Sequence, residues 1–139
     1  MTIIEKIKYP GKFFKRLFKW GGLGLLTGAF GGLLGALFSH TLSFVTDLRA
    51  ANPWLIFLLP VGGLATVGIY RLFGMRNNRG TNDIIDAILN NRPVKILVAP
   101  VIFIATAITH LFGGSAGREG AALQLGGAGA SALAKLFRL

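Results

Sequence analysis

The sequence has 139 residues, of which 53% are hydrophobic and only 14% are charged, and its mean hydropathy of +0.61 excludes an ordinary soluble domain of this size. Its formal net charge of +10 does not indicate nucleic-acid binding, because the Lys and Arg residues lie between or beside long apolar runs and are not interleaved with aromatic residues on a polar face. The absence of cysteine excludes disulfides and thiolate metal sites, and we expect neither a metal nor a cofactor.

Residues 1–19 are predicted to form a basic amphipathic helix that lies on the membrane surface and acts as a topology signal. The apolar run over 21–45 follows, and at about 1.5 Å per residue it exceeds a hydrocarbon core of roughly 30 Å. Three glycines of this run recur every four residues, and we expect this small-residue stripe to pack against other helices of the chain or of a partner. They are Gly24, Gly28 and Gly32.

A second apolar run covers 54–69, and Pro60 and the Gly62-Gly63 pair are predicted to bend it. The polar stretch over 70–93 is rich in arginine, so this stretch and the N-terminus are both predicted to be cytoplasmic.

The third apolar run covers 96–112, and the fourth covers 121–134. The fourth is too short to cross a bilayer and follows the glycine-rich stretch GGSAGREG. These features predict a discontinuous helix that begins inside the membrane.

The stretch GGSAGREG carries the predicted chemistry. The first turn of a helix presents unpaired N–H groups and the positive end of the helix dipole, which together favour an anion. Glu119 places a carboxylate at the same spot, where it can stand in for the anion until it is protonated. The alternative is that Glu119 only complements the helix dipole. The expected amide donors are Arg118, Glu119, Gly120 and Ala121, and the glycines expected to let the backbone approach an ion are Gly113, Gly114 and Gly117.

An enzyme is not expected. Ser115 lies in a G-x-S-x-G pattern, but His40 and His110 both precede it, whereas the hydrolase order requires a histidine after the serine. Asp83 and Asp86 are more simply interpreted as complementing a helix dipole than as a cation site.

The string THLFGGSAGREGAALQLGG over 109–127 resembles the Gly-Lys/Arg-Glu-Gly-Pro element of the CLC chloride channels and proton-coupled anion antiporters. The similarity extends through most of 20–139, and RGTNDIIDAI over 79–88 falls where the family has its Gly-Ser-Gly-Ile-Pro element. The resemblance implies an all-α integral membrane protein with tilted and discontinuous transmembrane helices, corresponding to the first inverted repeat of a CLC-type transporter. It implies that Glu119 is the gate, with Arg118, Gly120 and Ala121 at the outer anion site. It also places Arg79, Gly80 and Thr81 near the central site.

The implied substrates are chloride or fluoride together with protons, in a bacterial inner membrane with a cytoplasmic N-terminus, and the implied full-length assembly is a homodimer. Two departures from the family pattern are reminiscent of its fluoride-exporting branch. Ala121 replaces the usual proline after the glutamate, while Arg79 and Asn82 replace the serine and proline of the first element. Chloride against fluoride, and channel against antiporter, both stay open.

Family members are several hundred residues long and contain two inverted repeats, so residues 20–139 are interpreted as a truncated CLC-type membrane domain. The second repeat, or a partner chain that supplies it, is expected outside this sequence. The alternative is a nonconducting fragment or split-protein subunit that packs with partner helices.

Overall fold

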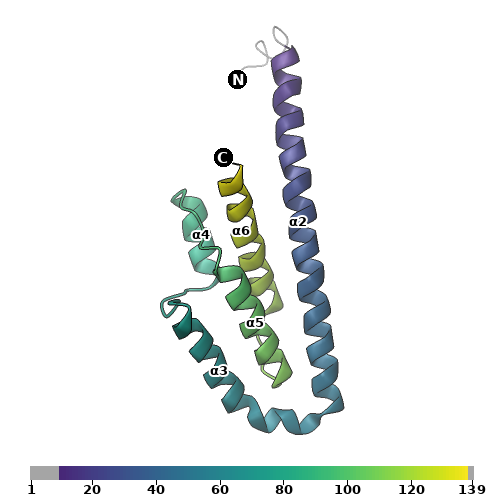
Figure 1. Cartoon of the computed structure of the whole chain (residues 1–139), viewed down its shortest axis with the longest axis vertical. Helices are drawn as coiled ribbons and strands as arrows, with labels where there is room; N and C mark the ends of the chain where they lie inside the picture. Colours follow the sequence, from purple (N-terminus) through teal and green to yellow (C-terminus); the bar gives the residue numbers. More distant parts are fainter. Residues whose placement is uncertain (1–9, 138–139) are drawn as a thin grey trace.

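The computed structural model describes residues 10–137, which form an all-helical structure (Figure 1). In chain order the helices are α2 (Pro10–Ala51), the 3-10 helix η1 (Pro53–Leu58), α3 (Leu59–Leu72), α4 (Thr81–Leu89), α5 (Val98–Leu111) and α6 (Arg118–Leu136). No strand occurs within the described residues. The all-α prediction is confirmed.

Helix α2 runs without a break from one proline to the next. Pro10 is its first residue, where the missing N–H does no harm, and Pro53 follows its end. Its 42 residues span about 63 Å, roughly twice a hydrocarbon core. The sequence predicted a basic helix over 1–19 and a separate apolar segment over 21–45, but residues 10–19 continue directly into the apolar run. Glycine weakens a helix without removing a hydrogen bond, so the intervening glycines do not interrupt it.

Residues 1–9 lie outside the described part of the chain, and the surface location of residues 10–19 stays a prediction. In Figure 1 the start of α2, drawn in purple, extends beyond the other helices.

Two stretches are long and apolar enough to cross a membrane, Phe13–Ala51 with 39 residues and Pro53–Leu72 with 20. Only 6% of the most apolar window in each stretch is buried inside the protein. The core helix of a soluble protein would be mostly buried, and large side chains such as Phe57, Leu64 and Leu72 instead face outward. This apolar exterior is that of a membrane protein.

The apolar run predicted over 54–69 consists of η1 followed by α3. The change from 3-10 to α geometry occurs at Leu58 and Leu59, just before Pro60, so the chain changes direction slightly earlier than the sequence predicted. Gly62 is buried, and a Cβ there would collide with the ring of Phe112 at the end of α5. Gly62 therefore lets α3 pack closely against the α5 end of the bundle.

The short half-helix predicted over 121–134 is longer in the structure. Helix α6 begins at Arg118 and ends at Leu136, and its 19 residues span about 28 Å. Gly117, in an extended conformation, is its N-cap, so Arg118 and Glu119 already belong to the first turn. The helix therefore begins three residues earlier and ends two residues later than the predicted segment, because the charged pair belongs to the helix and does not precede it.

Helix α6 packs against α2, α4 and α5, and α2 and α5 also pack against each other (Figure 1). One apolar cluster joins Phe38 and Leu42 of α2 to Ala121 and Leu125 of α6. A second cluster contains the buried residues Met75, Val98, Val101 and Ala128. These clusters fix the start of α6 relative to its neighbours.

The glycine stripe of α2 lies on a different face from the one that packs. A Cβ built on Gly24, Gly28 or Gly32 meets no described atom within 4 Å. The contacting face instead carries Phe30 and Leu34, whose side chains lie against the position of a Cβ on Gly129. Packing through the glycine stripe stays a prediction for partners outside the described residues.

Candidate functional site

The first glycines of GGSAGREG end helix α5. The Gly113 N–H donates to His110 O at 3.1 Å, and the Gly114 N–H donates to Thr109 O at 2.8 Å. This is a Schellman cap, and it requires the positive φ of +83° that Gly113 adopts. A Cβ on Gly114 would lie 2.6 Å from Thr109 Cγ2. These two N–H groups are therefore already paired, and both glycines serve the turn.

The start of α6 presents the open backbone that the sequence predicted. The first four N–H groups of a helix lack intrahelical acceptors, and with Gly117 as N-cap these belong to residues 117–120. Gly117 has no side chain to accept from them, and a Cβ there would meet nothing within 4 Å. Ala121 is buried and lies one position beyond this set. Its N–H has the carbonyl of Gly117, four residues earlier, as its intrahelical acceptor. The open donors are thus one residue earlier than the predicted set.

Glu119 lies in the first turn of α6 with its side chain exposed. The ion pairs within residues 10–137 are those of Arg79, and none of them involves Glu119. Its carboxylate is therefore next to the open N–H groups and is not held by a cation in this part of the chain.

The start of α4 is more occupied than the sequence predicted. The Gly80 N–H donates to Asn78 Oδ1 at 2.6 Å, and the Arg79 N–H donates to Asp83 Oδ2 at 2.9 Å. Gly80 is the N-cap and adopts a positive φ of +66°. Of the three predicted amides, those of Arg79 and Gly80 are therefore taken by local side chains. Only that of Thr81 remains without such a partner.

The two helix starts lie side by side. A Cβ on Gly120 would be 3.2 Å from Thr81 Oγ1, and a Cβ on Gly80 would be 3.7 Å from Gln124 Nε2. One turn further along, Gly127 lies against the side chain of Ile84. Small residues on α6 thus let α4 approach closely. The structure brings Thr81 and Gly120 together, which the sequence could place only on separate segments.

Gln124 is a residue of this junction that the sequence reasoning missed. It is 5% exposed, and its Nε2 donates to Gly120 O at 3.2 Å. Its Oε1 is buried and accepts no hydrogen bond from any described residue. An unpaired buried oxygen of this kind is uncommon and is often associated with function. The available signal was a lone amide side chain within the small and apolar run over 120–130.

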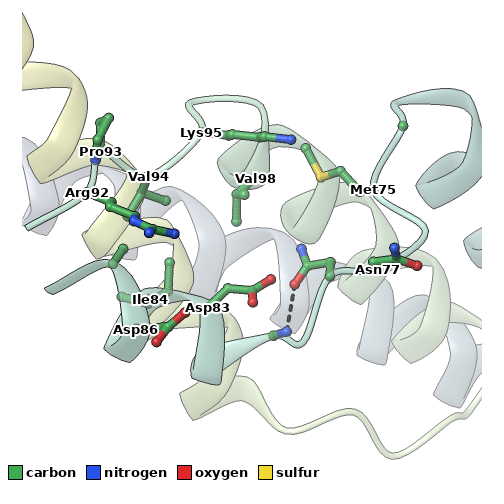
Figure 2. Close-up of a pocket in the computed structure, with 14 residues that line it drawn as sticks. Met75, Asn77, Asp83, Ile84, Asp86, Arg92, Pro93, Val94, Lys95 and Val98 are labelled. Carbon is green, nitrogen blue, oxygen red and sulfur yellow. Dashed lines mark hydrogen bonds between the residues drawn. The ribbon is translucent and has the colours of Figure 1, made fainter. Parts of the chain in front are cut away.

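A pocket of about 360 Å³ opens beside the start of α4. Figure 2 shows Asp83 on the α4 side, with Lys95 and Val98 across from it. Arg79 Nε donates to Asp83 Oδ1 at 3.0 Å, and Arg79 Nη2 donates to Asp86 Oδ2 at 3.2 Å. The hydrogen bond from the Arg79 backbone, reinforced by the guanidinium, lowers the pKa of Asp83. Both carboxylates are thus paired with arginine, and no group of metal-ligating side chains occurs within residues 10–137.

Residues 62–139, more than half of the chain, match the sequence model of a family described as voltage gated chloride channel. The chain is also similar to a protein from Pseudomonas syringae pv. tomato named "Chloride/fluoride channel protein", with 43% identity over 122 residues. That similarity covers 87% of this chain and 27% of the relative, so the chain spans about a quarter of the length of the curated relative it matches. No solved structure matches the chain. The matched range includes both helix starts described above.

Proposed function

We propose that this chain, which belongs to the voltage gated chloride channel family, contributes one half of a site through which chloride or fluoride crosses a membrane. The observation that supports this most strongly is the contact between the start of α4 at Thr81 and the start of α6 at Gly120. Two helix starts that meet in this way direct their positive ends and their unpaired N–H groups toward one place. An anion is the species that such a place stabilises.

In this proposal the anion binds to the N–H groups of Arg118, Glu119 and Gly120 and to that of Thr81. Glu119 is the gate. Its carboxylate competes with the anion for the α6 N–H groups, and protonation releases it, so each passage of an anion is linked to a proton. The exposed, unpaired carboxylate in the first turn of α6 supports this role.

We also propose a membrane, an orientation and an oligomeric state for this chain. The chain lies in a bacterial inner membrane with its N-terminus in the cytoplasm, and the complete assembly is a homodimer. This chain corresponds to about a quarter of its relative, and the second half of the site comes from sequence that this chain does not contain.

A second candidate function is that of a nonconducting subunit that packs against partner helices. The exposed glycine stripe of α2, formed by Gly24, Gly28 and Gly32, supports it because no described residue covers this face. Such a subunit would bind a partner without moving anions.

Efflux from liposomes tests the transporter proposal. Two proteins are reconstituted separately into liposomes loaded with fluoride or chloride: the purified chain, and a chimera in which the chain replaces the aligned segment of the Pseudomonas relative. Ion-selective electrodes record anion release together with proton movement. We expect anion release by the chimera, with proton movement lost in Glu119→Gln and retained in Asp47→Asn. Asp47 is an exposed carboxylate of α2 and serves as the matched control. Absence of release from both the chain and the chimera would leave only the nonconducting subunit.

A further inference from the structure

A cavity of about 330 Å³ lies beside the loop that precedes α6, on a side that Glu119 does not line. The cavity is lined by the end of α2, the end of α5 and the loop, and we call it the basic pocket. Its chemistry is set by Arg49, His110, Ser115 and Arg118. No acidic side chain lines it.

The two arginines of the basic pocket are not neutralised within the described part of the chain. Neither Arg49 nor Arg118 forms an ion pair with any of residues 10–137, where the ion pairs are those of Arg79. Arg49 is half-buried, and its Cδ and Nη1 lie 3.4 and 3.5 Å from the position of a Cβ on Gly113. The guanidinium is thus held against the capped end of α5. A partly desolvated guanidinium without a carboxylate is a strong donor to an anion.

His110 positions Arg118 in this pocket. The His110 Nδ1 lies 2.9 Å from Thr106 O, and a carbonyl can only accept, so Nδ1 carries the proton of this hydrogen bond. The other ring nitrogen then accepts from Arg118 Nε at 3.4 Å. His110 thus bonds to Arg118 through Nε alone, and the two Nη groups of Arg118 form no hydrogen bond with another described residue.

We infer that the basic pocket binds a small monovalent inorganic anion, and that it is a second anion position next to the backbone site. Its ligands are side-chain guanidinium groups of Arg49 and Arg118, whereas the site at Glu119 uses backbone N–H groups. Two uncompensated cations raise the local anion concentration one residue away from the gate. This role as a feeder for transport rests on the proposed function, but anion binding in the pocket does not.

Binding is measured without transport by the ³⁵Cl NMR line width of the purified chain in detergent, titrated with sodium chloride. Saturable broadening is expected, and Arg49→Gln and Arg118→Gln should each weaken the apparent affinity by about tenfold or more. Arg71→Gln removes the same charge from an exposed position outside the pocket and should leave the affinity unchanged. Circular dichroism checks that each variant keeps its helix content.

Ser115 offers a test that does not disturb the arginines. It is exposed in the loop, so Ser115→Glu should fold and place a carboxylate in the pocket, whereas Ser115→Gln adds the same volume without charge. The part of the chloride broadening that depends on Arg49 and Arg118 should disappear in the first variant only. His110→Gln keeps a side-chain acceptor for Arg118 Nε and should preserve anion binding. His110→Leu removes this acceptor and should lower the affinity for the anion.

Equal line widths in the wild-type chain, Arg49→Gln and Ser115→Glu would overturn the inference. Arginine-dependent binding in a chain and chimera that release no anion would instead support the pocket and contradict the proposed transport. If transport occurs, Arg49→Gln should raise the half-saturating anion concentration and leave the proton coupling intact. An unchanged half-saturating concentration would contradict the feeder role.

Discussion

Gly113→Ala probes the cap that separates α5 from α6. Gly113 adopts a φ of +83°, where a side chain is strained by about 1–2 kcal/mol. The space itself is adequate, because a Cβ there would have its nearest contacts at 3.4 Å, to Arg49 and Ile56. The loss of stability should therefore come from the backbone alone and lower the ratio of folded to unfolded protein roughly 5- to 30-fold. Denaturant titration in detergent micelles, followed by circular dichroism, measures it.

Gly63→Ala is the matched control for this prediction. Gly63 lies inside α3, and a Cβ there would meet nothing within 4 Å. Alanine is the better helix former by about 1 kcal/mol, so this variant should be as stable as the wild type or more stable. If Gly113→Ala and Gly63→Ala shift the midpoint in the same direction by the same amount, the cap does not have the geometry described.

Four further changes test the junction and its surroundings. Gly120→Val should lower anion efflux by about tenfold or more, because its Cβ would lie 3.2 Å from Thr81 Oγ1 and force α4 away from α6. Asp83 has a lowered pKa in the folded chain, so its stabilising effect is present above its ordinary pKa of 3.8 and is lost as the pH falls through the lower folded value. Asp83→Asn should remove that acid dependence from the unfolding curve, and an unchanged curve would contradict the pairing. Gln124→Leu should change stability by less than about 1 kcal/mol, because loss of the Nε2 hydrogen bond to Gly120 O is offset by removal of the unpaired buried Oε1. Ser131→Ala, in contrast, removes the acceptor of the part-buried Val94 N–H and should be destabilising by about 1 kcal/mol in the same measurement.

The helices were predictable from apolar runs, but the ends of two of them were not. The basic residues at 10–19 suggested a separate element, whereas helix continuity is decided by backbone hydrogen bonds, which only the prolines at 10 and 53 interrupt. Likewise, the apolar run indicated a helix only from 121, although Arg118 and Glu119 were expected among the first-turn donors. They fall in the first turn of α6 because Gly117 supplies the extended N-cap.

The proximity of open N–H groups and a carboxylate at the α6 start was predictable, because they belong to one contiguous stretch. The junction with α4 was not, since the contact between Thr81 and Gly120 depends on packing between segments about forty residues apart. Sequence also could not show that the Arg79 and Gly80 amides are already paired with Asp83 and Asn78. Those hydrogen bonds depend on side-chain conformations that the residue types alone leave open.

The adjacency of the two helix starts is the central claim, and the chain contains no cysteine that would confuse a cross-linking test. In a disulfide, the Cβ of one cysteine lies about 3 Å from the sulfur of the other. The corresponding distance here, from a Cβ on Gly120 to Thr81 Oγ1, is 3.2 Å. The double variant Thr81→Cys with Gly120→Cys should therefore form an intramolecular disulfide under mild oxidation in detergent, seen by mass spectrometry as protection of both thiols from alkylation. The control pair, Thr81→Cys with Gly126→Cys, should stay reduced, because a Cβ on Gly126 meets nothing within 4 Å. Failure of the first pair to cross-link, or equal cross-linking of both pairs, would contradict the adjacency.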